Sequence, residues 1–133
     1  MTTEQTCCQS LAAGGQSPFV ITELGGYDGF TSGLARCSAC GRAYHFELVA
    51  SDEERGERAY GFKEVAVVDH HAITALVAQT PPADDAVVML RVRDALSRSL
   101  ERNLFVLAAG LDTKIRAIET LDVERWRSIL KPV

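Results

Sequence analysis

Apolar and polar residues alternate through the first half of the chain, as they do in half-buried strands. The clearest stretch covers residues 42–50, where Tyr44, Phe46 and Leu48 share one face. Further strands are predicted over 18–24, 30–37 and 58–68, separated by glycine-containing turns at 25–29 and 51–57. Strands in such close succession predict a small antiparallel meander.

The second half carries helical periodicity instead. Residues 70–79 are predicted to form a short helix with Asp69 as its N-cap, and Pro81-Pro82 then starts a long helix. Apolar residues recur every three or four positions at Met89, Val92, Leu96, Leu100, Leu104 and Leu107, which predicts one continuous helix. Gly110 is predicted to end it. Asp112 and Asp122 are predicted to cap two more helices, although residues 113–121 also alternate like a strand.

These patterns predict an α+β fold: an N-terminal antiparallel β-meander of three or four strands, followed by a C-terminal layer of three or four helices. We expect one domain over 1–133, with a tail at 1–16, a β-sheet region at 17–68 and a helical region at 69–133. The length of 133 residues and the 47% hydrophobic content are typical of a single folded domain.

Composition narrows the classes of partner. Fourteen basic residues against eighteen acidic ones give a net charge of −4, which argues against a general nucleic-acid binder. The N-terminus lacks the basic and apolar regions of a secretory signal, and the longest apolar run, 104–109, is too short for a membrane helix. We therefore expect a cytoplasmic protein with no membrane partner. Eleven arginines against three lysines are typical of GC-rich bacterial coding.

The strongest chemical signal is the segment Cys37-Ser38-Ala39-Cys40-Gly41. A C-x-x-C step followed by glycine between two strands resembles the knuckle of a zinc ribbon, in which both thiolates reach one metal ion. A closed structural site needs four ligands, and Cys7 and Cys8 are the other two cysteines of the chain. The predicted cofactor is a structural zinc ion held by Cys7, Cys8, Cys37 and Cys40, which would tie the tail to the sheet.

Three alternatives stay open for these cysteines. The side chains of adjacent residues point in different directions, which makes it difficult for Cys7 and Cys8 to bind one ion together. A histidine (His45, His70 or His71) is then an equally acceptable fourth ligand beside three cysteines. The thiols can also be free, with no metal bound. Redox chemistry is the third alternative, but no helix begins after Cys40 to lower the pKa of a nucleophilic thiol.

Other charged and aromatic groups have simpler interpretations. Asp69-His70-His71 is interpreted as a helix cap with two partly exposed histidines, since one helix cannot easily aim both rings at one ion. The arginines of the long helix (Arg91, Arg93, Arg98 and Arg102) are interpreted as a solvated face, and Trp126 as the anchor of the last helix. No catalytic set is recognisable.

The expected function is therefore a non-enzymatic cytosolic protein-binding module, a regulatory or adaptor protein, whose partner is another protein. Homodimerisation is left open. One alternative is an immunity-type antitoxin whose acidic loop at 51–57, with Glu53, Glu54 and Glu57, blocks a basic toxin. A C-x-x-C thiol redox enzyme or sensor is a second alternative. A zinc-ribbon nucleic-acid binder is disfavoured by the acidic charge.

Overall fold

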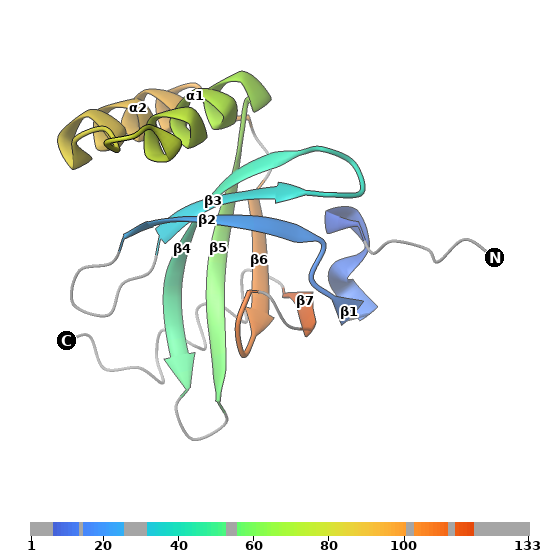
Figure 1. Cartoon of the computed structure of the whole chain (residues 1–133). Coiled ribbons are helices and arrows are strands. Elements are labelled where there is room, and N and C mark those ends of the chain that lie inside the picture. The colour runs from blue at the N-terminus through green and yellow to red at the C-terminus, as the bar shows by residue number, and fades with distance from the viewer. Residues whose placement is uncertain are drawn as a thin grey trace.

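The computed structural model describes residues 7–13, 15–25, 32–52, 56–100, 103–111 and 114–118. In chain order the elements are a 3-10 helix η1 (Cys8–Ala13), β1 (Gly15–Gln16), β2 (Phe19–Gly25), β3 (Ser32–Cys37), β4 (Ala43–Asp52), β5 (Glu57–Val65), α1 (Val67–Ala78), α2 (Asp85–Ser97), β6 (Asn103–Ala108) and β7 (Lys114–Ile118). The strands form one antiparallel sheet in the order β1-β7-β6-β5-β4-β3-β2. This sheet is curled like half of a barrel, and the two helices lie together beyond one end of it (Figure 1). Neither helix is long and apolar enough to cross a membrane, among the residues described.

The predicted architecture, a meander of three or four strands under three or four helices, is wrong. The four strands expected between residues 18 and 68 are present as β2 to β5. The described part of the chain then contains two helices, after which it returns to the sheet as β6 and β7. The region 69–133, expected to be helical, therefore supplies two strands of a seven-stranded sheet.

The error lies in the apolar stripe assigned to the long helix. That helix ends at Ser97, and residues 103–108 form β6, with β5 on one side and β7 on the other. Leu104 packs in the interior of the sheet while Leu107 packs with Ala59 on the other face, so the strand is buried on both faces. A short apolar run buried on both faces has the same periodicity in a strand as in a helix.

Both helix starts differ from those predicted: α2 begins at Asp85 and not at Pro81-Pro82, and α1 begins at Val67. Asp84 caps α2 through its side chain, which accepts a hydrogen bond from the backbone N–H of Ala86 at 3.3 Å. Asp69 lies inside the first turn of α1 and is not its N-cap; it accepts a hydrogen bond from Arg98 at 2.8 Å. Residues 114–118 form β7, so the strand alternative holds there, whereas the helix predicted after Asp122 lies outside the described residues.

The curl of the sheet follows from a very short connection. β1 pairs with β7 at one edge and β2 pairs with β3 at the other, yet Ser17 and Pro18 alone separate β1 from β2. Three peptide steps span at most about 11 Å, so the two edges must lie close together. The backbone N–H and the hydroxyl of Ser38 both donate to the carbonyl of Pro18, at 2.9 and 2.8 Å, and so hold this connection against the β3–β4 turn.

The interior of the curl is filled by aromatic rings. Phe19, Tyr44, Phe46, Tyr60 and Phe62 are all buried there, with ring centroids 4.8 to 6.2 Å apart in the contacting pairs. Gly33 allows β2, β3 and β4 to approach at this point. A Cβ on Gly33 would lie 2.4 Å from the carbonyl oxygen of Thr22 and 2.8 Å from the Phe46 ring. Glycine is therefore required at this position by packing.

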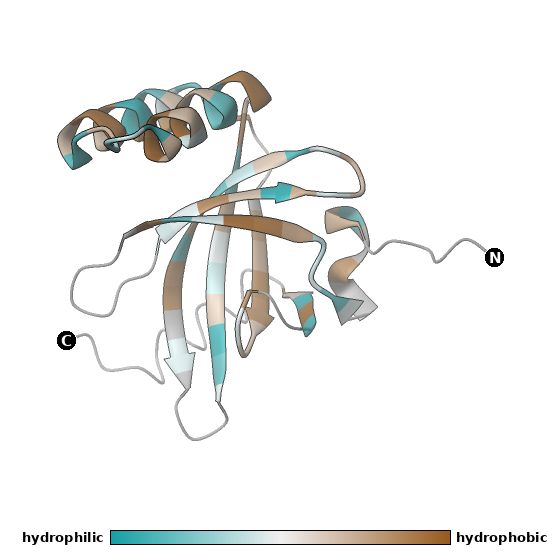
Figure 2. Ribbon diagram, viewed as in Figure 1, coloured by the Kyte–Doolittle hydropathy of each residue, from teal (hydrophilic) through white to brown (hydrophobic). Residues whose placement is uncertain are grey.

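The helical hairpin of α1 and α2 covers part of the outer face. Ile73, Val88, Val92 and Ala95 from the helices are buried with Leu34, Ala43 and Val65 from β3, β4 and β5. Figure 2 shows hydrophobic residues in both helices, and those with exposed side chains include Val68, Met89 and Leu90. The hairpin is inserted between β5 and β6, which pair with each other directly.

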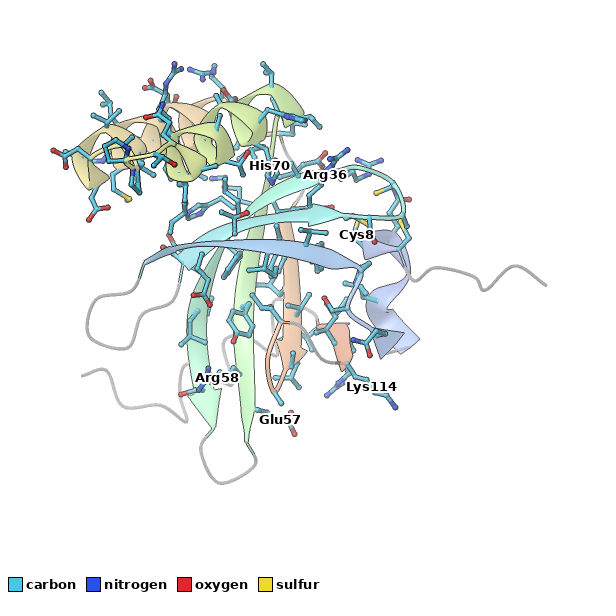
Figure 3. All side chains as sticks on the ribbon, viewed as in Figure 1. Cys8, Arg36, Glu57, Arg58, His70 and Lys114 are labelled. Carbon is cyan, nitrogen blue, oxygen red and sulfur yellow. The ribbon has the colours of Figure 1, made fainter. Side chains whose placement is uncertain are left out.

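His70 lies in α1 and is buried, with only 8% of its surface exposed. Neither of its ring nitrogens has a hydrogen-bond partner among the described residues. Burial lowers the pKa of His70, and the positive charges of His71 and Arg36 lower it further. Figure 3 shows His70 and Arg36 where the hairpin meets the sheet. The neutral imidazole is therefore the form that fits the folded protein.

We predict that acid weakens the fold through His70. Its pKa is lower in the folded chain than the ordinary value of 6.5, so below pH 6.5 the unfolded chain binds the proton more readily. The free energy of unfolding should fall as the pH drops from 6.5 towards the lowered pKa of the folded state. Urea denaturation on both sides of this pH measures the effect. The free energy of unfolding should fall less for His70→Leu than for the wild type. The exposed neighbour provides the comparison: His71→Gln removes one of the two charges that act on His70, so its fall should be slightly smaller than that of the wild type and larger than that of His70→Leu. A fall in His70→Leu equal to that of the wild type would contradict the assignment.

Candidate metal centre

The structure brings all four cysteines together. Cys37 is the last residue of β3, Cys40 lies in the turn to β4, Cys8 begins η1 and Cys7 directly precedes it. Their sulfur atoms all lie within 4.8 Å of one another, and none of the cysteines is in a disulfide. This group can hold a metal ion, and it contains all four residues of the predicted site. Figure 3 shows Cys8 at the side of the sheet where η1 meets the β3–β4 turn.

The β3–β4 turn has the local geometry of a metal knuckle. The N–H of Gly41 donates to the carbonyl of Cys37 at 2.8 Å, and Gly41 has a φ of +80°, which favours glycine. The backbone N–H groups of Ala39 and Cys40 point at the sulfur of Cys37. The glycine after the second cysteine thus closes the turn, as the sequence predicts.

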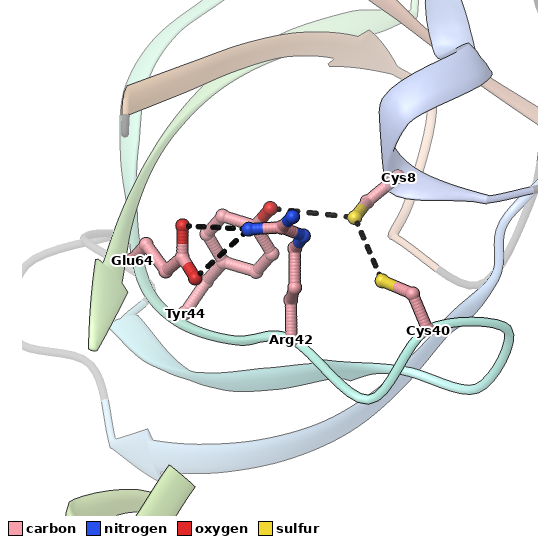
Figure 4. Close-up of polar contacts among 5 residues, drawn as sticks. All are labelled: Cys8, Cys40, Arg42, Tyr44 and Glu64. Carbon is pink, nitrogen blue, oxygen red and sulfur yellow. Dashed lines mark hydrogen bonds and ion pairs between the residues drawn. The ribbon is translucent and has the colours of Figure 1, made fainter. Parts of the chain in front are cut away.

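The 3-10 helix η1 allows the adjacent residues Cys7 and Cys8 to reach the same cluster. Cys8 is 1% exposed, and its backbone N–H donates to the sulfur of Cys37 at 3.4 Å. Its own sulfur lies 3.5 Å from that of Cys40 and accepts a hydrogen bond from the hydroxyl of Tyr44 at 3.3 Å (Figure 4). Because the helix begins at Cys8, Cys7 precedes the regular backbone and its sulfur reaches the same cluster.

The spacing of the sulfurs matches a tetrahedral ion. A zinc–sulfur bond of about 2.3 Å places the sulfurs of a tetrahedral site about 3.8 Å apart. In this cluster the sulfurs of Cys8 and Cys40 are 3.5 Å apart, and the sulfurs of every pair lie within 4.8 Å of each other. The most widely separated sulfurs therefore have to approach by at most about 1 Å, or ~0.5 Å each, to bring all four onto one ion.

The electrostatics of the cluster favour a cation. Burial raises the pKa of Cys8 far above its ordinary value, and it also raises that of Cys40, where the thiols of Cys37 and Cys7 add to the effect. Burial acts on Cys37 in the same direction, but the N–H groups of Cys8, Cys40 and Ala39 outweigh it and lower the pKa of Cys37 to about 7. Without a cation the cluster can carry little negative charge. A bound dication would ionise the thiols, so binding should release protons and weaken as the pH falls.

An arginine network borders the cluster. Arg42 forms an ion pair with Glu64 at 3.3 Å, which raises the pKa of the guanidinium. The Gln9 amide, oriented with its oxygen towards Arg42, accepts from Nε and Nη2 at 2.8 and 3.0 Å. Figure 4 shows this pair beside Tyr44 and the cysteines. These contacts fix η1 and β5 around the site, and they lie outside what the cysteine pattern predicts.

The histidines considered as metal ligands lie elsewhere. His45 is buried on β4, His70 is buried in α1 and His71 is exposed, and none of the three belongs to the cysteine group. Burial lowers the pKa of His45, against the opposing charge of Glu47. The fourth ligand candidate in the described chain is therefore a cysteine.

The other candidate residues are spread over the molecule. Arg98 pairs with Asp69, and Arg91 and Arg93 are exposed on α2. Glu57 begins β5. Arg102, Glu53, Glu54 and Trp126 lie outside the described residues, so the interpretations placed on them stay predictions.

Comparison with known proteins adds no assignment: no family model, curated protein sequence or solved structure matches the chain.

We predict that Tyr44→Phe weakens metal binding. The variant removes the hydroxyl that donates to the sulfur of Cys8 and leaves the four sulfurs in place. Loss of such a supporting hydrogen bond costs about 10–100-fold in metal affinity. Competition of zinc between the protein and a chromogenic chelator measures the change. Tyr60→Phe is the matched control, because Tyr60 is also buried in the aromatic interior but outside the cysteine cluster. Equal affinities of the two variants would contradict a role for the Tyr44 hydroxyl.

Proposed function

We propose that this protein is a small non-enzymatic binding module of the cytosol, a regulatory or adaptor protein, whose fold is completed by one structural zinc ion. The observation that carries the metal part of the proposal is the cluster of Cys7, Cys8, Cys37 and Cys40, with all sulfurs within 4.8 Å. Four thiolates with no open position are the ligand set of structural zinc sites, whereas catalytic sites keep a position for water or substrate.

The donor set supports zinc over harder cations. Thiolate sulfur binds zinc, copper(I) and iron–sulfur clusters, whereas magnesium and calcium take oxygen ligands. The backbone around Cys37 also supports metal binding. N–H groups from Ala39, Cys40 and Cys8 point at the sulfur of Cys37. Such hydrogen bonds disperse the negative charge of thiolates around zinc.

The same geometry makes a C-x-x-C redox enzyme the weaker proposal. A catalytic thiol needs both a low pKa and access to solvent. Cys37 has a pKa of about 7 but is 0% exposed, whereas Cys40 is exposed but has a raised pKa. The two requirements therefore fall on different residues.

Zinc would act as a tie between segments far apart in the chain. It would join η1 to the β3–β4 turn, since Cys8 and Cys40 are 32 positions apart in the chain. Cys8 and Cys37 also belong to the hydrophobic core of the curled sheet. The ion would therefore stabilise both the N-terminal segment and the part of the core that contains Cys8 and Cys37.

Native mass spectrometry of protein purified without added metal or chelator tests the zinc proposal. We expect one zinc per chain. Apparent zinc-binding free energies of zinc-finger peptides are about 10–16 kcal/mol, similar to or above the roughly 5–15 kcal/mol by which domains are stable. Chelation, or the Cys37→Ser substitution, should therefore unfold the chain. Ala39→Ser is the matched control, since it places the same side chain in the same exposed turn and should keep the zinc. A metal-free chain of full stability would contradict the proposal.

The outer surface of α2 supports a protein-binding role. In the part of the chain that the structure describes, seven large hydrophobic residues are exposed, and six of them lie on or beside the helical hairpin: Val67, Val68, Val87, Met89, Leu90 and Leu100. Leu90 is 60% exposed, and its neighbours Arg91 and Arg93 form no ion pair with any described residue. Val87 and Leu90 are three positions apart on α2 and so share one side of this helix, with Arg91 next to them. This side of the helix complements a partner surface that combines apolar side chains with carboxylates.

We predict that Leu90→Asp disrupts this interaction. Val20→Asp is the matched control, because Val20 is 63% exposed on β2, away from the hairpin. The partner would be identified by crosslinking in the cell of origin, and then measured as a purified pair by titration calorimetry. The Kd should rise at least about tenfold, or ~1.4 kcal/mol, for Leu90→Asp and stay unchanged for Val20→Asp. Equal effects of the two substitutions would contradict the assignment. So would sedimentation showing that the only species bound at this face is a second copy of the chain.

A further inference from the structure

The four cysteines differ in their access to solvent. Cys40 is exposed and Cys7 is partly exposed, whereas Cys8 and Cys37 have 1% and 0% of their surface exposed. A small oxidant arriving from solvent therefore meets the sulfur of Cys40 first. In a zinc-bound cluster this sulfur is a thiolate, the nucleophilic form, because a coordinating thiol is deprotonated.

The sulfur of Cys8 is placed to react with an oxidised Cys40. The two sulfurs are 3.5 Å apart without being bonded, and they belong to different segments of the chain. Cys37 is the other candidate because it shares the C-x-x-C turn. Its sulfur, however, accepts hydrogen bonds from the N–H groups of Cys8, Ala39 and Cys40. The choice of Cys8 rests on the 3.5 Å distance between its sulfur and that of Cys40.

We propose that Cys40 is a modification site for hydroperoxides, at which oxidation forms a Cys8–Cys40 disulfide and releases the zinc ion. This proposal rests on the zinc site of the proposed function. It assigns the disulfide to a pair that joins η1 to the β3–β4 turn, and not to the C-x-x-C pair.

The chemistry proceeds in two steps. The Cys40 thiolate attacks one oxygen of the peroxide, so that an S–O bond forms, the O–O bond breaks and hydroxide (or alkoxide) leaves. Cys40 is thereby oxidised by two electrons to a sulfenic acid, and the peroxide is reduced. The Cys8 thiolate then attacks the Cys40 sulfur; the S–S bond forms, the S–O bond breaks and a second hydroxide leaves. Two of the four thiolate ligands are consumed, so the zinc ion dissociates.

The structural result differs from loss of zinc by chelation. The covalent bond between Cys8 and Cys40 keeps η1 against the turn, whereas a chelator leaves only non-covalent contacts such as the hydrogen bond from Cys8 to Cys37 and that between Gln9 and Arg42. Cys7 and Cys37 become free thiols. The oxidised chain should therefore stay folded after it has lost its metal, and reduction with added zinc should restore the original site.

The experiment treats the zinc-loaded full chain with one equivalent of hydrogen peroxide. Released zinc is followed with a chromogenic chelator, free thiols are alkylated, and the disulfide is mapped by tandem mass spectrometry. We expect release of about one zinc per chain and a Cys8–Cys40 bond, at a peroxide level that leaves Met89 as the thioether; Met89 is 44% exposed and serves as an internal control for general oxidation.

Each other outcome overturns a specific claim. A Cys37–Cys40 or Cys7–Cys40 bond, retention of zinc, or irreversible oxidation of Cys40 that dithiothreitol does not reverse would overturn the assignment of this site. Absence of zinc from the untreated chain would instead overturn the proposed function. The metal content before peroxide is added therefore separates the two failures.

Discussion

The two-residue connection between β1 and β2 is the constraint on which the rest of the structure depends. It joins strands that occupy opposite edges of the sheet, so the sheet can form only if its edges come together. η1 directly precedes β1 and packs against β7. The curl therefore delivers Cys7 and Cys8 to the end of the sheet where β3 turns into β4. A flat sheet of the same strand order would leave the cysteines apart.

The cysteine cluster is continuous with the hydrophobic core. Cys8 and Cys37 are buried in the same cluster as Phe19 and the other interior rings, and Tyr44 spans both because its ring packs in the core while its hydroxyl reaches Cys8. Water is thereby kept from one side of the cysteine group. Each electrostatic interaction inside such a site is stronger than it would be in solvent. The helical hairpin contacts the opposite face of the sheet, so the surface proposed for binding and the cysteine cluster are built from separate parts of the core.

The sequence predicts the parts of the fold that depend on local pattern. Strict alternation around Tyr44 identifies β4, and the C-x-x-C-G segment predicts the knuckle and both of its ligands. It also predicts the set of four cysteines, because no others exist, but it gives no reason to expect η1, whose backbone makes adjacent ligands compatible. The continuation of a helix to Gly110 is wrong, because Leu104 and Leu107 fit a helical stripe as well as a strand buried on both faces. Pairing with β5 and β7 decides between them, and pairing partners distant in the chain are invisible to local periodicity.

The pairing of the edge strands also constrains the order in which parts of the structure can form. Gly15 pairs with Ile115, so the sheet cannot close until nearly the whole described chain has been synthesised. The cysteines have no such delay, since Cys8 and Cys40 are 32 residues apart and β2, β3 and β4 lie within the first 52 residues. During synthesis the N-terminal part of a chain leaves the ribosome first. The N-terminal cysteines can therefore find their partners while β7 is still unmade, and the early cluster would hold η1 beside the place that its last strand comes to occupy.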